Sequence, residues 1–402
     1  MKYVLLFCSL FSLSCFAQND QRHTKISKND EQLEIVRQPE PYPSDKLKSL
    51  SSFPKNDDNN PLGIDFRMYD LSTFNLKDHE ADLKYATFDS KTLWPKNLPS
   101  GFNPKEIMEL GKNPGLGVRS LHKKGITGKN VGIAIIDQAL LVNHIEYKNV
   151  LKMYEEILWF NPKNNPRATM HGLAVASIAV GQNIGVAPEA SLYFIAESNT
   201  NPENKIDYNP IAQSIDRILQ INRKLPADKK IKVISISRGF SPNDIGYKEL
   251  IASIEKAKVE NIFVVSCSLN NIYGFNFQGL GRKFMGSPDK ISSYIKGLFW
   301  KNYKDFDKLI ASEKILLVPM DNRTTAGPTG DKDYAYYADG GLSWAVPYIA
   351  GLYALAVQVK PEVSPKEFWD TAMATGDTIT TDSYKLGKIV NPAKIIETLQ
   401  KK

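Results

Sequence analysis

Three residues far apart in the chain, Asp137, His171 and Ser343, are of the types that together perform nucleophilic catalysis. A serine hydroxyl is a weak nucleophile until a neighbouring base takes its proton, and an imidazole is the commonest such base. A carboxylate beside the imidazole fixes its tautomer and stabilises its charged form. Such a set can cleave an acyl bond through a covalent intermediate. Each residue alone is weak evidence, so its sequence context decides what it indicates.

Ser343 stands between the pair Gly340-Gly341 and an apolar run that predicts a helix. In the first turn of a helix, unpaired backbone N–H groups and the helix dipole stabilise negative charge. A tetrahedral acyl intermediate develops that kind of charge. An ordinary helix-capping serine occupies the same kind of position. In the same way, Asp137 alone fits a turn residue and His171 alone fits a structural histidine.

The elements that would position these residues alternate regularly from about residue 110 onward. Continuous apolar runs predict buried strands, and apolar residues at helical spacing predict helices. The predicted strands are 131–136, 191–196, 231–236, 262–265 and 315–318, and the predicted helices are 171–180, 211–219, 247–260 and one that Ser343 opens. This alternation favours a parallel sheet covered on both faces, with working residues at the carboxyl ends of its strands.

The chain order Asp, His, Ser on such a framework is the order of the subtilisin fold. Three blocks resemble the subtilisin-like (subtilase) serine protease family: Val131–Asp137, a strand that ends in the aspartate; His171–Ala179, followed by Gly-Val-Ala-Pro at 185–188; and Gly341–Gly351 around the serine. The resemblance covers residues 110–402 as one peptidase domain. It implies an α/β, three-layer fold with a central, mostly parallel sheet and helices on both faces.

The resemblance implies an exported serine endopeptidase that acts on a protein or peptide substrate. Ser343 would attack the peptide carbonyl, His171 would move the proton, and Asp137 would orient the imidazole. Asn270 would donate a hydrogen bond to the oxyanion together with the backbone N–H of Ser343. An extended substrate would pair with the strand-like segment Ser235, Ile236, Ser237, Arg238 and Gly239.

Several residues depart from the family's pattern. Leu269 stands where glycine usually precedes the asparagine, so Asn271 competes for the oxyanion role if the register slips by one residue. Leu342 and Trp344 are unusual neighbours for the serine. No catalytic group is lost, but a pseudoprotease that binds peptides as a scaffold is the alternative function. An esterase of the α/β-hydrolase type is excluded, because its nucleophile comes first in the chain within a Gly-x-Ser-x-Gly elbow.

The proposed chemistry requires no cofactor, and the sequence identifies no metal site. His144 and Glu146 lack a third ligand at a diagnostic spacing. Structural calcium is common in the family, but no stretch of this chain identifies ligands for it. Cys267, which follows the strand 262–265, is predicted to be a small core residue, with a thiol role as the alternative.

Residues 1–17 have the pattern of a secretory signal peptide: a positive start, an apolar run over 3–13, and small residues before a cleavage site after Ala17. This predicts a secreted, periplasmic or cell-surface protein. The apolar run is too short for a transmembrane anchor. Lipid attachment at Cys15 is the alternative to simple cleavage. Cleavage leaves Cys267 as the single cysteine, which excludes an intramolecular disulfide.

The region that follows divides by composition. Residues 18–60 are rich in polar residues and proline and predict a flexible leader. Residues 61–109 regain apolar content, which fits either an accessory segment or a pro-segment that is removed on maturation. Within the peptidase domain, residues 271–312 predict a long excursion. The net charge of +7 is spread along the 402 residues without a Lys/Arg block, so nucleic acid is not an expected partner.

Overall fold

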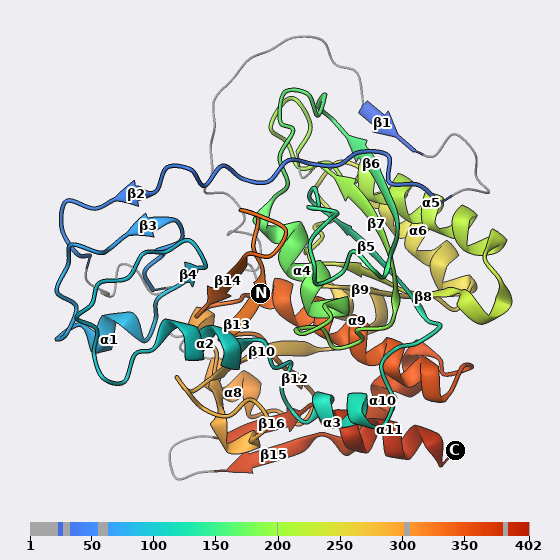
Figure 1. Cartoon of the computed structure of the whole chain (residues 1–402). Helices are drawn as coiled ribbons and strands as arrows, with labels where there is room; N and C mark the ends of the chain where they lie inside the picture. The colour runs from blue at the N-terminus through green and yellow to red at the C-terminus, as the bar shows by residue number, and fades with distance from the viewer. Residues whose placement is uncertain are drawn as a thin grey trace.

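The computed structural model of the chain describes residues 23–26, 33–54, 63–198, 200–300, 306–380 and 385–401. The predicted signal peptide, with Cys15, lies outside these residues, as do parts of the predicted leader. Within the described part, strands and helices alternate in the predicted order, and the strands form four sheets, of six, five, three and two strands (Figure 1).

The largest sheet has six strands in the order β1-β6-β7-β5-β8-β9. Its members are β1 (His23–Lys25), β6 (Leu151–Leu158), β7 (Ser191–Glu197), β5 (Gly132–Asp137), β8 (Ile231–Ile236) and β9 (Phe263–Ser266). The five strands from β6 to β9 run parallel, and β1 pairs antiparallel with β6. All six residues of β5 are buried, as expected of a central strand covered on both faces.

Helices cover both faces of this sheet, which confirms the three-layer α/β architecture. The helices are α4 (Met170–Val180) and α9 (Leu342–Val359) on one face and α5 (Asn209–Lys224) and α6 (Tyr247–Val259) on the other. Alternate residues of β5 point to opposite faces. Ile133 and Ile135 are therefore buried with α4 and α9, whereas Ala134 and Ile136 are buried with α5 and α6.

The strand β6 is absent from the sequence-based prediction because two glutamates interrupt its apolar pattern. Both carboxylates are fully buried, and each has an arginine partner. Glu155 accepts two hydrogen bonds from Arg217 of α5, at 2.9 and 2.8 Å. Glu156 is paired with Arg37 at 2.6 Å. Burial of a charge is tolerated when it is paired and hydrogen-bonded, so these arginines allow glutamates inside a sheet.

Residues 33–54 differ from the flexible leader that their composition predicts. The N–H of Val36 donates to the carbonyl of Tyr154, and the N–H of Tyr154 donates to the carbonyl of Glu34. Further along, the main chain of Glu40 exchanges hydrogen bonds with residues 166 and 168. The polar composition did not indicate this order. Main-chain hydrogen bonds and Arg37 hold the segment, and neither kind of contact requires apolar side chains.

The predicted excursion over 271–312 contains regular elements in its described part. These are α7 (Leu269–Tyr273), β10 (Phe277–Arg282), β11 (Tyr294–Lys296) and α8 (Phe306–Ile310). A second sheet has the order β11-β10-β12-β16-β15, completed by β12 (Leu316–Pro319), β16 (Lys385–Ile389) and β15 (Asp377–Thr380). The helices α3 (Val118–Lys123), α10 (Pro365–Thr375) and α11 (Pro392–Gln400) pack beside the long helix α9 or beside one another.

The accessory segment, taken here as residues 63–109, forms a small unit against the peptidase domain (Figure 1). It contains β3 (Tyr69–Asp70), which pairs with β2 (Lys48–Ser49), and α1 (Glu80–Leu83), β4 (Phe88–Asp89) and α2, which starts in the segment (Pro104–Gly111). A three-stranded sheet joins β4 to β14 (Tyr334–Tyr337) and β13 (Arg323–Ala326). Because β4 hydrogen-bonds to β14, the segment shares a sheet with the chain just before Ser343.

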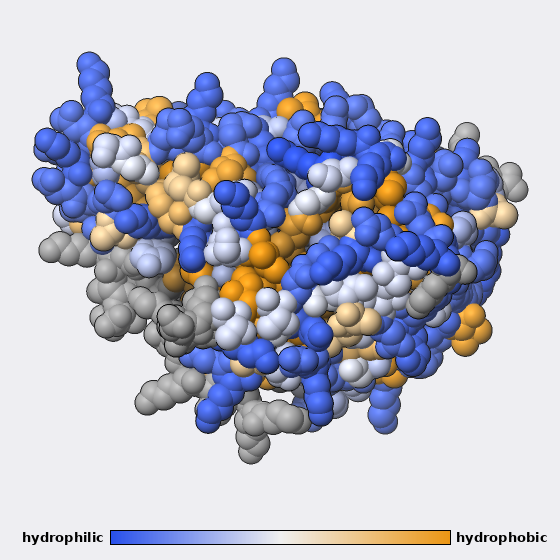
Figure 2. Space-filling model, turned by 90° about the horizontal axis from the view of Figure 1, so that it is seen from below, coloured by the Kyte–Doolittle hydropathy of each residue, from blue (hydrophilic) through white to orange (hydrophobic). Residues whose placement is uncertain are grey.

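One helix in the described part of the chain, α9, is long and apolar enough to cross a membrane, with a mean hydropathy of 1.4. However, 78% of it is buried inside the protein, so its apolar surface belongs to the core. In the view of Figure 2, hydrophilic side chains cover most of the surface, and apolar ones show between them in a narrow band.

Candidate active site

Asp137 and His171 meet at the carboxyl edge of the large sheet. Asp137 is the last residue of β5, and His171 is the second residue of α4. His171 Nδ1 lies 2.7 Å from Asp137 Oδ1, and the Asp137 side chain is only 6% exposed. The close approach depends on Gly172, because a Cβ there would lie 2.2 Å from the carbonyl oxygen of Gln138. The sequence therefore brings the start of α4 against the end of β5.

The electrostatics of this pair favour a charged imidazole. Burial lowers the pKa of His171, but the negative charge of Asp137 and the hydrogen bond to it outweigh that effect, so the pKa is raised above its usual value. When Nδ1–H of the neutral His171 donates to the carboxylate of Asp137, Nε2 carries the lone pair. His171 is thus oriented to accept a proton at Nε2 and to hold it.

Ser343 lies in the first turn of the helix α9. The chain just before it makes a tight bend that requires glycine at positions 340 and 341. A Cβ on Gly340 would lie 2.2 Å from the carbonyl oxygen of Met320, and Gly341 has a φ of +62°. Asp321, at the end of β12, accepts a hydrogen bond from the N–H of Gly340 at 3.1 Å. Burial and the charge of Asp339 raise the pKa of Asp321 well above its usual range. This turn fixes the start of the serine helix.

The hydroxyl of Ser343 is half-buried and faces the segment that follows β8. Ser343 Oγ donates to the carbonyl of Ser237 at 3.3 Å, and Ser237 Oγ donates to the carbonyl of Ser343 at 2.9 Å. A hydrogen bond from Ser343 Oγ to His171, which nucleophilic attack requires, is not among those in the described part of the chain. The ring of Trp344, the next residue, lies 5.5 Å from the His171 ring.

The predicted substrate segment divides into two parts. Ser235 and Ile236 are buried in β8, and Ser235 pairs with β5 on one side and β9 on the other. Ser235 therefore cannot receive an added strand, so the prediction is wrong for this residue, whereas Ile236 pairs with Ser266 of β9 and its role stays a prediction. Ser237 is buried beside Ser343, whereas Arg238 and Gly239 lie beyond the end of β8 and are partly exposed. Residues 237–239 can line a cleft.

The asparagine predicted for the oxyanion follows β9 after a turn rather than ending the strand. Asn270 lies in the short helix α7 and is exposed, and so is Asn271. No contact in the described part of the chain joins either side chain to Ser343, so the choice between them stays a prediction. Cys267, half-buried, packs against the core that contains α9.

Residues 128–295 match the model of the subtilase family, a range that holds Asp137 and His171 and ends before Ser343. Subtilisin NAT of Bacillus subtilis subsp. natto is 25% identical over 278 residues, which cover 67% of this chain and 66% of that protein. Subtilisin DY of Bacillus licheniformis is 25% identical over 274 residues, which cover 66% of this chain and 90% of that protein. This chain is therefore similar to the subtilase family, and the match to the family model covers residues 128–295.

The range that matches the subtilase model includes the elements that carry Asp137 and His171. The aligned region spans 66% of the length of subtilisin NAT. Among solved structures, that of the PatG macrocyclase in complex with peptide is 16% identical to this chain, with a TM-score of 0.49, and the match covers 70% of this chain and 95% of that chain.

A further ionisable residue, Glu197, lies beside the Asp137–His171 pair. It ends β7 next to β5, and its side chain is only 4% exposed. Its Oε1 lies 3.4 Å from Arg238 Nη1, and its Oε2 is buried with no hydrogen-bond partner among the described residues. Burial raises the pKa of Glu197 to about 7, against the opposing charge of Arg238. The sequence does indicate this residue, because a glutamate directly after an apolar run is expected at the carboxyl end of a strand, where functional residues gather.

The histidine considered as a metal ligand has other partners in the structure. His144 is fully buried, its Nε2 is hydrogen-bonded to the carbonyl of Asp333, and its Nδ1 accepts from the N–H of Glu146. The carboxylate of Glu146 accepts hydrogen bonds from Asn183 and Tyr334. Among the residues that the structure describes, no three metal-binding side chains gather into one site.

Replacement of Glu197 tests whether this carboxyl group is desolvated in the folded protein. Its pKa is raised from 4.5 to about 7, so the folded state holds the proton more tightly than the unfolded state does. The protonated carboxyl group of Glu197 therefore stabilises the folded protein fully below pH 4.5, and this stabilisation is lost as the pH rises through about 7. Relative to Glu197→Gln, the free energy of unfolding of the wild type should therefore fall by up to roughly 3 kcal/mol over that range.

Urea denaturation at a series of pH values measures this difference. Glu203→Gln, at an exposed glutamate in the loop after β7, serves as the control and should change the pH dependence far less, because the ion pair of Glu203 with Lys205 is exposed to solvent. Parallel stability curves for the wild type and Glu197→Gln would show that Glu197 is hydrated and that its burial has no electrostatic consequence.

Proposed function

We propose that this protein is a serine endopeptidase in which Ser343 is the nucleophile, His171 the general base and Asp137 the residue that orients it. The proposal is supported above all by the 2.7 Å contact between Asp137 and His171, with the imidazole lying against Trp344, the neighbour of Ser343. A buried aspartate that holds a histidine beside a helix-borne serine is the arrangement that acyl transfer requires.

The first half of the proposed reaction forms an acyl-enzyme. The hydroxyl of Ser343 turns from the carbonyl of Ser237 to Nε2 of His171. Catalytic hydrogen bonds often tighten only when substrate is bound. Oγ attacks the peptide carbonyl as His171 takes the proton, and Asp137 stabilises the imidazolium. The proton then passes to the leaving amine as the C–N bond breaks.

The second half returns the enzyme to its starting state. A water molecule gives its proton to His171 and attacks the acyl carbonyl, and the proton then returns to Ser343 Oγ as the C–O bond breaks. In both halves the oxyanion meets the first N–H groups of α9, where the helix dipole favours negative charge. Asn270 is the proposed side-chain donor. The reaction uses only protein groups and water, and no cofactor.

The proposed substrate is a protein or peptide in an extended conformation. Residues 237–239 follow β8 at the carboxyl edge of the sheet, and Ser237 exchanges hydrogen bonds with Ser343, so a chain lying along this segment would pass the serine. We further propose that residues 1–17 direct export and are removed, with the enzyme secreted, periplasmic or attached to the cell surface. Lipid attachment at Cys15 would give an enzyme attached to the cell surface.

A peptide-binding pseudoprotease is the second candidate function. It is favoured by the hydrogen bond of Ser343 Oγ to Ser237 rather than to His171, and by the exposed positions of Asn270 and Asn271. In that case the same segment would bind peptides, but Ser343 would not react.

Chemical labelling separates the two functions. A fluorophosphonate probe should modify the wild-type protein at Ser343, because the probe requires a serine activated by a base. Ser343→Ala should abolish both the labelling and the cleavage of a denatured protein substrate, whereas Ser237→Ala should retain labelling at Ser343. Mass spectrometry of the labelled peptide identifies the site. Proteolysis that survives in Ser343→Ala would contradict the assignment, and an unlabelled wild type would support the pseudoprotease.

Alanine replacement distinguishes the two candidate oxyanion donors. Asn270→Ala should reduce kcat by about 10²–10³, a magnitude established for one such donor in the subtilase family, with little change in KM. Asn271→Ala, one residue away and equally exposed, is the matched control and should act almost as the wild type. Steady-state kinetics on a peptide anilide measures both. The opposite result would assign the role to Asn271 and shift the alignment by one residue.

A further inference from the structure

The accessory segment is joined to the peptidase domain through β14, the strand that leads toward Ser343. Phe88 of β4 pairs with Tyr336 of β14, and their rings lie 5.1 Å apart. Ser90 exchanges hydrogen bonds with the main chain of Tyr334 at the same junction. Tyr336 and Ala338 are buried in the apolar cluster of the segment itself. The segment and β14 therefore form one packed unit.

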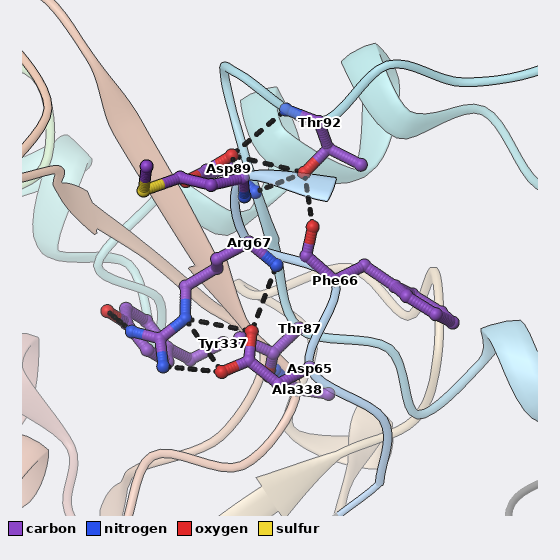
Figure 3. Close-up of polar contacts among 9 residues, drawn as sticks. Asp65, Phe66, Arg67, Thr87, Asp89, Thr92, Tyr337 and Ala338 are labelled. Carbon is purple, nitrogen blue, oxygen red and sulfur yellow. Dashed lines mark hydrogen bonds and ion pairs between the residues drawn. The ribbon is translucent and has the colours of Figure 1, made fainter. Parts of the chain in front are cut away.

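Arg67 of the segment reaches the next residue of β14, Tyr337 (Figure 3). Its Nη1 donates to the hydroxyl of Tyr337 at 2.9 Å, and its guanidinium lies 5.1 Å from the centre of the Tyr337 ring. Asp65 holds the other edge of the guanidinium through two nitrogens, at 2.9 and 2.6 Å. Figure 3 shows the guanidinium between the carboxylate and the phenol. A planar, two-sided contact of this kind fixes the position of Arg67 closely.

The contacts continue from Tyr337 to the catalytic pair. The ring of Tyr337 lies edge-on to that of Trp344, with centres 5.3 Å apart and an angle of 84° between the planes. Trp344 in turn lies 5.5 Å from the ring of His171. The indole of Trp344 is buried, and its Nε1 has no hydrogen-bond partner in the described part of the chain. Packing alone therefore fixes the indole, and Tyr337 provides one of its walls.

We propose that Arg67 is a positioning residue for His171, acting through Tyr337 and Trp344, and that the accessory segment is a lasting part of the working enzyme. The proposal rests on the function proposed above. A pro-segment that only covered the cleft would contact the residues that receive the substrate. The contacts described here reach His171 through Tyr337 of β14 and Trp344. Removal of the segment would expose the shared cluster and release Tyr337.

The test replaces Arg67 with methionine, which keeps the apolar stem of the side chain and removes its hydrogen bonds. Labelling of Ser343 by a fluorophosphonate should slow by about tenfold, as expected for the loss of one hydrogen bond to a charged group. The imidazole signal of His171, observed by NMR with 15N-labelled histidine, should shift or broaden. Tyr337→Phe, which keeps the ring but loses the hydroxyl, should reproduce both effects.

Lys91→Met is the matched control. Lys91 lies in the same segment and pairs at 3.0 Å with Asp333, just before β14, but it does not contact Tyr337. Because a surface ion pair contributes little, this variant should label within about twofold of the wild type, with an unchanged His171 signal.

A double replacement separates positioning from general stability. If Arg67 acts through Tyr337, Arg67→Met combined with Tyr337→Leu should label no more slowly than Tyr337→Leu alone. Multiplying effects would overturn the proposal, as would an Arg67→Met variant that loses thermal stability but keeps the labelling rate and the His171 signal. A wild type that no probe labels would instead contradict the proposed function, and the His171 signal would still report on the contacts from Arg67.

Discussion

The close packing of α4 against α9 is the constraint on which this active site depends, because these two helices carry His171 and Ser343. Their approach requires small residues. A Cβ on Gly351 of α9 would lie 2.6 Å from Val186 Cβ and 3.3 Å from the carbonyl of Ala179 at the end of α4. Both helices are almost wholly buried against the parallel sheet. Since protein interiors are close-packed, helices held in this way cannot shift without opening cavities in the core. The positions of the two side chains follow from that packing.

Electrostatics adds a second constraint, because two buried carboxyl groups lie at neighbouring strand ends of the large sheet, Asp137 on β5 and Glu197 on β7. Burial raises the pKa of Glu197, which means that it disfavours the charged form of this group. Groups of this kind lower the stability of a fold unless they are paired, and perturbed pKa values gather at functional sites. The charges of Asp137 and Glu197 both raise the pKa of His171, which fits a site in which a developing positive charge on the imidazole is stabilised by its surroundings.

The sequence predicted the fold well where local patterns dominate. Continuous apolar runs located β5 and β7, and the glycines beside Ser343 located the start of α9. Prediction failed where long-range contacts override composition. The buried glutamates of β6 depend on Arg37 and Arg217, and neither partner can be inferred from the strand itself.

The candidate site was predictable to a similar extent. Asp137 and His171 meet as the motif suggested. Ser235 and Ile236 proved to be interior residues of β8. The sequence did not indicate this, because a run of alternating residues does not show at which residue a strand stops pairing with its neighbours. The contact of Arg67 with Tyr337 joins residues 270 positions apart and has no local signal at all.

The crystal structure of the protein after reaction with a fluorophosphonate tests the central claim most directly. We predict phosphorus bonded to Ser343 Oγ, His171 still bonded to Asp137, and the phosphoryl oxygen facing the first N–H groups of α9. Phosphorus on another residue, or a Ser343 adduct from which His171 and the helix N–H groups point away, would contradict the account.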